Sequence, residues 1–288
     1  MHRALRWIRN VVVSLVVLLL IIVATVYALS ERIIRRTYDE PLVPVAVPTD
    51  SASITEGGRL ALVHGCRGCH MKDLSGQWFE DDFLIGRLAA PNLTEAAQKY
   101  SDAELVRLIR HGVRPDGKSV LAMPSEMFTP LTDADLGAII AYIRSVAAVP
   151  GLSRTVQLGP MARFGLVTGQ YEPSAVWVHK VDSVTASGYY PVADQPNALG
   201  AYLARTSCTE CHGLTLNGDF GPNLRIAAGY TREQFAHFFA TGEAQGGREL
   251  PLMSVMARNR FSHFTDEEES ALYAYLVARA SAQDQPAP

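Results

Sequence analysis

The sequence has no run of basic residues and no large excess of either charge. Lysine and arginine total 26 against 29 acidic residues, which gives a formal net charge of -3. Proteins that bind nucleic acid usually concentrate positive charge on one face, so this composition gives no indication of nucleic-acid binding. Hydrophobic residues make up 48% of the chain, a share that permits a core in each of two domains.

Long apolar runs are also absent, apart from one near the N-terminus. Residues 11–29 carry no charge, and a helix that rises ~1.5 Å per residue over this length can cross the ~30 Å hydrocarbon layer of a bilayer. Trp7 and Tyr27, near the two ends of the run, suit the membrane interfaces. We therefore expect residues 1–30 to form an N-terminal membrane anchor.

The charges around this run do not fix its orientation. Three arginines precede the run and three follow it, namely Arg3, Arg6 and Arg9, then Arg32, Arg35 and Arg36. The excess of positive charge that marks a cytoplasmic end is therefore missing. A cleaved signal peptide is the alternative to an anchor, because the start is charged and Ala28-Leu29-Ser30 resembles a cleavage site. The run is longer than the ~7 to 15 apolar residues typical of such peptides.

The rest of the chain contains an internal repeat behind a proline-rich segment. Residues 31–50 hold three prolines, and we expect an extended linker that keeps the next domain away from the membrane. Further on, Pro91-Asn-Leu93 recurs as Pro222-Asn-Leu224, and Tyr100 and Tyr230 open similar segments at an offset of 130. We expect two copies of one domain, in residues 51–150 and 195–288, joined by residues 151–194.

Helix signals fall at the same places in both copies. Each copy has a capping box followed by a glycine at the expected helix end: Ser101 to Glu104 with Gly112, and Thr231 to Gln234 with Gly242. A third capping box, Thr265 to Glu268, predicts the start of a later helix in the second copy, and Thr132 opens its counterpart in the first. Apolar residues recur at helical spacing after both. No alternating strand pattern is visible in either copy. The predicted fold class is therefore all-α, with an irregular joining segment in which Val176-Trp-Val178 suggests a short strand.

Cysteine is scarce, and all four cysteines lie in two CxxCH motifs. The motifs are Cys66, Cys69 and His70 in the first copy and Cys208, Cys211 and His212 in the second. On a helical turn, positions i and i+3 place both sulfurs on one face, where they can add to the two vinyl groups of a haem. The next residue then brings its imidazole under the iron. This pattern predicts two covalently bound haem c groups.

Three other uses of these cysteines are open. Paired disulfides are possible outside the cytoplasm but leave the histidine after each pair unexplained. A single zinc site would need the two pairs to converge, although 142 residues separate them. A thioredoxin-like redox pair expects a βαβ setting, which the sequence does not show.

Each copy resembles a class I cytochrome c domain, and the chain resembles membrane-anchored dihaem c-type cytochromes. The resemblance covers residues 51–148 and 195–281. It implies a helical fold around the haem, with a histidine on one side of the iron and a methionine on the other. It also implies that the carbonyls of Pro91 and Pro222 accept a hydrogen bond from the Nδ1–H of the motif histidines, which fixes each ring and raises its basicity.

The two copies depart from each other in the spacing to this proline. Pro91 lies 21 residues after His70, whereas Pro222 lies 10 residues after His212. The first copy therefore has a longer loop, with Trp78 and three acidic residues at 80–82. We expect a solvated surface loop, the alternatives being a shield for the first haem or a docking site for a partner.

The methionine ligand implied by the resemblance has two candidates in each copy. Met123 and Met253 are related by the offset of 130, whereas Met127 falls on Ala257 and Met256 falls on Glu126. We therefore expect the iron ligands to be His70 with Met123 and His212 with Met253, while the other methionines fill the core. The remaining histidines are weaker candidates: His64, His111, His179, His237 and His263.

Two axial ligands leave no open site for a substrate, and the thioether of methionine favours ferrous iron. We expect an electron-transfer protein without catalytic activity of its own. It would carry single electrons between a periplasmic dehydrogenase or quinol-oxidising complex and an oxidase or soluble cytochrome. The resemblance places such proteins in the bacterial inner membrane, as a single pass with the haem domains facing the periplasm.

Two other classes of function are alternatives. A dihaem peroxidase or a sulfur-oxidising cytochrome needs an open or thiolate-ligated haem. The two CxxCH motifs together contain all four cysteines, so none is left to provide a thiolate ligand. A redox or gas sensor needs a labile ligand and a signalling domain, and the sequence shows neither.

Overall fold

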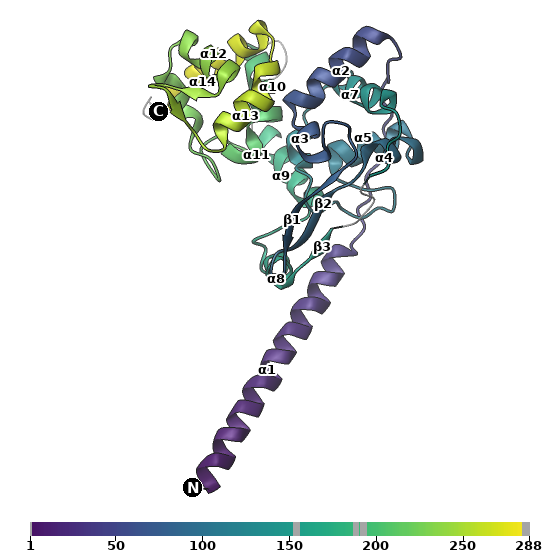
Figure 1. Cartoon of the computed structure of the whole chain (residues 1–288), viewed down its shortest axis with the longest axis vertical. Helices are drawn as coiled ribbons and strands as arrows, with labels where there is room; N and C mark the ends of the chain where they lie inside the picture. The colour runs from purple at the N-terminus through teal and green to yellow at the C-terminus, as the bar shows by residue number, and fades with distance from the viewer. Residues whose placement is uncertain (1, 152–155, 187–189, 191–194, 284–288) are drawn as a thin grey trace.

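A single long helix at the N-terminus, α1 (His2–Ile34), projects away from the rest of the molecule (Figure 1). The computed structural model describes residues 2–151, 156–186, 190 and 195–283. Met1, residues 284–288 and parts of the expected joining segment (152–155, 187–189 and 191–194) lie outside the described residues. The most apolar stretch of α1 has a mean hydropathy of 3.0 and none of it is buried, so the helix fits a membrane anchor by length and composition.

The first copy is a helical domain with one hairpin. Its elements are α2 (Ser51–Val63), α3 (Cys66–His70), β1 (Gln77–Asp82), β2 (Gly86–Ala90), α4 (Leu93–Lys99), α5 (Asp102–His111), α6 (Ser125–Phe128) and α7 (Asp133–Ser145). Helix α5 begins at the predicted capping box and ends at Gly112, whose φ is 65°. Helices α2 and α7 pack against each other, and their buried side chains Leu60, Leu136 and Ile140 form the centre of the core.

The second copy has the same order of helices. Its elements are α10 (Ala198–Ser207), α11 (Thr209–His212), η1 (Leu224–Gly229), α12 (Arg232–Thr241), β4 (Glu243–Ala244), β5 (Arg248–Glu249), α13 (Met253–Asn259), η2 (Phe261–His263) and α14 (Asp266–Gln283). Both capping boxes predicted for this copy are present, at Thr231 and at Thr265. The prediction of a mostly helical chain is confirmed.

Each copy brings two helices together at a glycine. A Cβ on Gly57 of α2 would lie 1.9 Å from the carbonyl oxygen of Ala138, and a Cβ on Gly200 of α10 would lie 2.1 Å from that of Ala271. Neither distance is possible for real atoms, so only glycine permits this approach of α2 to α7 and of α10 to α14. The helices that lead into the CxxCH motifs are thereby fixed against the last helix of their own copy.

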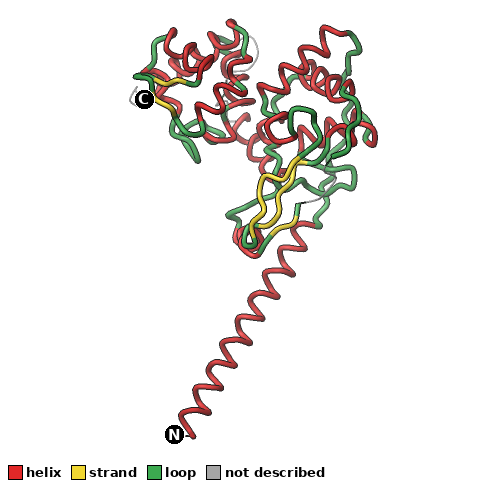
Figure 2. Tube along the Cα trace, in the orientation of Figure 1, coloured by secondary structure: helices red, strands yellow, loops and turns green. Residues whose placement is uncertain are grey.

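The expectation that neither copy contains strands was wrong: β4 pairs with β5 in the second copy, and in the first copy the loop after the motif forms a hairpin. Strands β1 and β2 form an antiparallel hairpin, and β3 (Gln157–Leu158) adds to β2 from the joining segment. Figure 2 shows these strands as a narrow extension that points from the helical body toward α1. The turn is stabilised by Asp82, whose carboxylate accepts hydrogen bonds from the backbone N–H of Leu84 and Ile85 at 2.7 and 2.8 Å. The loop is therefore ordered rather than merely solvated.

The joining segment is also more regular than its sequence predicted. It contains α8 (Pro160–Thr168) and α9 (Ser174–Ala186), so residues 176–178 are helical and not a strand. Local propensity favoured a strand at the valines, but burial of Ala175, Val178 and Val181 along one face stabilises a helix instead.

The proline-rich segment is likewise not a free spacer. Val45 and Val47 pack against the core of the first copy, and the backbone at Ala46 lies against Gly137 of α7. The backbone N–H of Tyr38 donates to the carbonyl of Gly117 at 2.8 Å. Residues 37–48 therefore run along the first domain and couple it to α1.

Candidate functional site

The two CxxCH motifs form the short helices α3 and α11. All four thiols are free, so neither pair forms a disulfide in this structure. Burial raises the pKa of Cys66 to about 11 and that of Cys208 to about 12, so these thiols are neutral at physiological pH. Among the described residues, no group of three or more His, Cys, Asp or Glu side chains is placed to hold a metal ion.

The histidine of each motif is oriented by a proline carbonyl, as the sequence predicted. His70 Nδ1 lies 2.7 Å from the carbonyl oxygen of Pro91, and His212 Nδ1 lies 2.6 Å from that of Pro222. A carbonyl can only accept, so Nδ1 carries the proton and donates it. Burial lowers the pKa of both rings, although the carbonyl contact opposes this shift. Each neutral ring therefore keeps the lone pair of Nε2 available for a metal, and this donor set fits a haem iron.

The chain follows the same path after each motif, despite the different spacing to proline. Leu74 and Leu216 lie four residues after the motif histidine, are fully buried and have φ values of 61° and 56°. Two residues later, Gly76 and Gly218 have φ values of 82° and 105° and donate their N–H to the carbonyl of the motif histidine. This repeated turn sets the histidine against its proline. The equal spacing of this leucine and this glycine after each motif is the sequence signal for the turn.

Met123 lies in a loop braced by the joining segment. Ser174, at the start of α9, donates its hydroxyl to the carbonyl of Met123 at 2.6 Å. The Tyr171 hydroxyl donates to the carbonyl of Leu121, two residues before Met123. Met123 is partly buried, whereas Met127 is 1% exposed and fills the core of the first copy. Met123 therefore stays the predicted ligand, and the contact from Ser174 gives α9 a structural task that the sequence did not reveal.

Met253 occupies the matching place in the second copy. It begins α13, and Ser254 beside it donates its hydroxyl to the carbonyl of Gly242, the residue that ends α12. Met253 and Met256 are both partly buried against the core, so burial does not separate these two candidates. The choice of Met253 rests on its equivalence to Met123.

The other histidines have structural contacts. His64 is buried and its Nδ1 lies 3.0 Å from the carbonyl of Thr206, while burial lowers the pKa of His64 to about 4. His111 and His179 lie 3.7 and 4.0 Å from the carboxylate of Glu40, His237 lies 3.6 Å from that of Glu243, and the carbonyl of His263 accepts from Arg59.

The segments before the two motifs meet at the contact between the copies, although the motifs are far apart in the sequence. His64 and Thr206 each lie two residues before the first cysteine of their motif. Arg260 crosses the same contact: its Nε donates to the carbonyl of Val63 at 3.1 Å, and its Nη1 lies 3.3 Å from the carboxylate of Glu210 in the second motif.

Arg260 is 8% exposed, and its guanidinium packs against Gly65, the residue before Cys66. Its positive charge opposes the effect of burial on the pKa of Cys66 and Cys208. One cation therefore acts on both motifs. The sequence offered no signal for this residue, because its partners are backbone and side-chain groups of two different copies.

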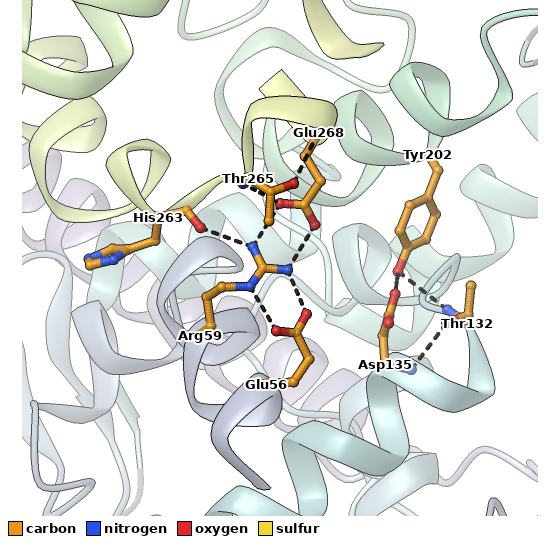
Figure 3. A network of polar contacts seen from close by, with 8 residues as sticks. All are labelled: Glu56, Arg59, Thr132, Asp135, Tyr202, His263, Thr265 and Glu268. Atoms are coloured by element: carbon orange, nitrogen blue, oxygen red, sulfur yellow. Dashed lines mark hydrogen bonds and ion pairs between the residues drawn. The ribbon is translucent and has the colours of Figure 1, made fainter. Parts of the chain in front are cut away.

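A polar network surrounds this contact (Figure 3). Arg59 of α2 forms a two-bond pair with the carboxylate of Glu268 at 2.7 and 2.8 Å and also pairs with Glu56. Tyr202 of α10 donates its hydroxyl to Asp135 of α7. Asp135 and Glu268 are the third residues of α7 and α14, so the first helix of each copy contacts the start of the last helix of the other.

Comparison with known proteins identifies the family. A family model described as cytochrome c oxidase, cbb3-type, subunit III matches residues 53–143 and again residues 195–276. The chain belongs to this family of c-type cytochromes. Each matched region contains one CxxCH motif with its proline and methionine, so the predicted resemblance to membrane-anchored c-type cytochromes is confirmed.

Relatives of this cytochrome are named as subunits of dehydrogenases. It is 29% identical over 270 residues to the fructose dehydrogenase cytochrome subunit of Gluconobacter japonicus, an alignment that covers 82% of this chain and 54% of the relative. It is 33% identical over 176 residues to the cytochrome c subunit of alcohol dehydrogenase (quinone) from Gluconacetobacter polyoxogenes, covering 57% and 36%. It is 29% identical over 248 residues to a subunit of nicotinate dehydrogenase from Pseudomonas putida, covering 75% and 21%. The chain thus spans about half or less of the length of these relatives.

Proposed function

We propose that this cytochrome is a membrane-anchored dihaem electron carrier and the cytochrome subunit of a dehydrogenase. It receives single electrons on the periplasmic side from the dehydrogenase, or from a quinol-oxidising complex, and passes them to an oxidase or a soluble cytochrome. The names of its relatives support a dehydrogenase as the donor. The presence of one CxxCH motif in each of the two matched regions supports a count of two haems.

The observation that carries the proposal is the matched set of donors in each copy. His70 and His212 are held by proline carbonyls with Nε2 available. Met123 lies in a loop held by the Ser174 hydroxyl, and Met253 begins α13 beside Ser254, whose hydroxyl donates to the carbonyl of Gly242. Haem c bound by such a set supplies reversible one-electron chemistry at an iron with two protein ligands. The chain itself keeps both ligands in place, so little rearrangement accompanies a change of charge.

The contact between the copies supports passage of electrons from one half to the other. The residues that precede each motif touch across it, through His64 and Thr206 and through Arg260. The path between the two attachment sites therefore runs through protein rather than solvent. Because Arg260 adds positive charge near both motifs, it favours the reduced state in each copy.

The end of α1 supports its retention as an anchor rather than cleavage as a signal peptide. Ser30 is fully buried, and its hydroxyl accepts a hydrogen bond from Arg163 of α8 at 2.9 Å. Cleavage near Ser30 would remove part of this contact. A retained anchor keeps the haem domains close to membrane partners and raises their effective concentration.

The ligand assignment is tested with leucine variants of the purified protein. Met123→Leu and Met253→Leu are each expected to abolish the sulfur-to-iron charge-transfer absorption of one haem and to lower the potential of that haem, because leucine cannot coordinate iron. Met127→Leu is the matched control, since Met127 fills the core. Retention of both absorptions in Met123→Leu contradicts the assignment of Met123 as a ligand, whereas a high-spin haem in the unaltered protein contradicts the carrier assignment.

The partner is tested by purifying the tagged protein from solubilised membranes. A dehydrogenase subunit in stoichiometric amount, whose substrate reduces both haems, is the expected result. Recovery of the cytochrome alone, with no dehydrogenase able to reduce it, argues against a permanent subunit.

A further inference from the structure

The structure has a group of exposed apolar side chains beside the end of α1. They lie at the turn of the β1–β2 hairpin and on α8, and are Phe83, Leu84, Ile85, Met161 and Phe164. Phe83 is 84% exposed, and the gathering of five exposed apolar side chains in one place is typical of an interaction surface. We call these five residues the apolar shelf.

The shelf is one continuous surface, although its residues come from two parts of the chain. The backbone N–H of Met161 donates to the carbonyl of Leu84 at 2.9 Å, and that of Gly159 donates to Ile85 at 2.8 Å. Strand β3 pairs with β2 just before α8 begins. The start of α8 is thus hydrogen-bonded to the hairpin turn, which holds the two parts of the shelf together.

The shelf lies at the level where the apolar run of α1 ends. Helix α8 packs on α1 through Arg163, which contacts the Ser30 hydroxyl at 2.9 Å and the Glu31 carboxylate at 3.1 Å and lies 4.8 Å over the ring of Tyr27. The uncharged run stops at residue 29. Figure 1 shows α8 and the hairpin turn beside this end of α1, with the helices of the second copy farther away. A bilayer entered by α1 therefore has its surface at the shelf.

Two acidic residues beside the shelf, Asp81 and Asp82, have partners inside the protein. Asp82 accepts hydrogen bonds from the backbone N–H groups of the turn, and Asp81 forms an ion pair with Arg87 at 3.1 Å. The guanidinium of Arg87 also lies 4.5 Å from the centre of the Trp78 ring. Tyr27 and Arg163 are residue types that suit a membrane interface. These contacts reduce the negative charge beside the exposed apolar side chains, which fits an apolar surface against zwitterionic lipid.

We propose that the apolar shelf inserts into the boundary between the headgroups and acyl chains of the bilayer that α1 enters, and fixes the orientation of both haem domains on the membrane. This inference rests on the proposed membrane anchor. Inserting apolar side chains into this boundary removes their surface from water, and the anchor makes the insertion an intramolecular step at high effective concentration.

The test uses the full-length protein with both haems attached, placed in nanodiscs of phosphatidylcholine. Single cysteines at Phe83→Cys or Phe164→Cys carry a spin label, and its access to oxygen, which partitions into lipid, is compared with its access to a water-soluble nickel complex. Phe220→Cys is the matched control, because Phe220 is 81% exposed but lies in the second copy. The expected result is loss of access to the nickel complex at positions 83 and 164, with full access at 220.

Two further arms separate the possible failures. A label at Leu18→Cys reports on the anchor itself: if it is open to the nickel complex, the membrane anchor fails and with it the proposed topology. If position 18 is in lipid but 83 and 164 remain open to water, the shelf proposal is overturned. Protection of 83 only when a purified partner subunit is added also overturns it, because the shelf then docks protein. The variant Met161→Ser combined with Phe83→Ser is expected to return the label at 164 to water.

Discussion

The contact between the two copies depends on Arg59, and its replacement by methionine provides a direct test. Methionine replaces the aliphatic part of the arginine side chain but carries no charge. Arg59→Met therefore removes the two-bond pair with Glu268, the pair with Glu56 and the bond to the carbonyl of His263. Only the Glu56 pair lies within one copy. The loss is therefore expected to fall mainly on docking of the second copy against the first.

The size of the effect follows from the burial of the pair. The side chains of Arg59 and Glu268 are 22% and 16% exposed, so solvent screens them less than a surface pair. Hydrogen bonds to charged groups contribute about 1.5–3 kcal/mol to stability, and we expect a loss of about 2–3 kcal/mol in Arg59→Met on that scale. In a body of this size each 1 kcal/mol lowers the thermal midpoint by about 2–4 °C, so the expected shift is about 4–12 °C.

The assay is differential scanning calorimetry of the detergent-solubilised protein, with Arg258→Met as the matched control. Arg258 also pairs with a glutamate through two bonds, but Arg258 and Glu249 are 42% and 67% exposed and lie in the same copy. Exposed pairs are worth about 0–1 kcal/mol, so the control should shift the midpoint by less than about 4 °C.

A double-mutant cycle identifies the partner. Glu268→Gln keeps an oxygen that accepts the N–H of Thr265, so the helix cap remains while the charge is lost. The coupling free energy between Arg59→Met and Glu268→Gln should be about 1–2 kcal/mol. Additive effects of the two changes, or a shift no larger than that of Arg258→Met, would refute the role of Arg59 between the copies.

Three further predictions concern titration, helix packing and haem attachment. Burial raises the pKa of Glu126 from 4.5 to about 7, so the folded state favours the protonated acid. The free energy of unfolding therefore falls as pH rises from about 4.5 to 7. Glu126→Gln should remove most of this loss, as measured by the thermal midpoints at pH 5 and pH 8. Gly57→Ala and Gly200→Ala should each lower stability by about 1–3 kcal/mol or more through overpacking, seen as a lower urea midpoint, whereas Gly229→Ala, which has open space, should not. Cys208→Ser should leave one thioether bond on the second haem and two on the first, measured by the masses of the haem peptides; loss of both haems would contradict independent attachment.

The features that the sequence predicted correctly are those fixed by neighbouring residues. A capping box needs only a hydroxyl and an acid or amide three residues apart, and such pairs begin α5, α12 and α14 in the structure. The hydrogen bond from each motif histidine to its proline carbonyl also involves one short loop. These bonds form whenever the local segment takes its preferred path, so a local pattern is sufficient to predict them.

The hairpin after the first motif was missed because its residues do not alternate and because the third strand of its sheet is distant in the sequence. The segment that forms β1 does not alternate apolar and polar residues, since two aromatic residues are followed by three acids. It is held instead by Gln77, whose side chain donates to the carbonyl of Gly68 in the motif, and by pairing with β2. Strand β3 adds to β2 only after the chain has passed through α7. Residues so far apart leave no local signal.

The contact between the copies could not be predicted for a different reason, because its residues in one copy have no equivalent in the other. The position of Tyr202 in α10 is occupied by Leu60 in α2, and Arg59 corresponds to Ala201, at the same offset of 142 that relates the motifs. At the offset of 130, Arg260 corresponds to Pro130. A comparison of the two copies detects only the residues that both copies have, so it cannot detect these positions.

The two acids at the contact nevertheless show how a shared cap was adapted in each copy. Glu268 is long enough to accept the N–H of Thr265 and still bind Arg59. Asp135 is one methylene shorter and makes no such bond to Thr132; the Tyr202 oxygen lies 3.5 Å from the Thr132 nitrogen in its place and donates its hydrogen to Asp135. Because Tyr202 comes from the other copy, helix α7 begins with a cap that is complete only when the copies are docked. Tyr202→Phe should therefore weaken both the docking and the start of α7, whereas in α14 the cap survives separation, and hydrogen exchange at the first turns of the two helices would show this difference.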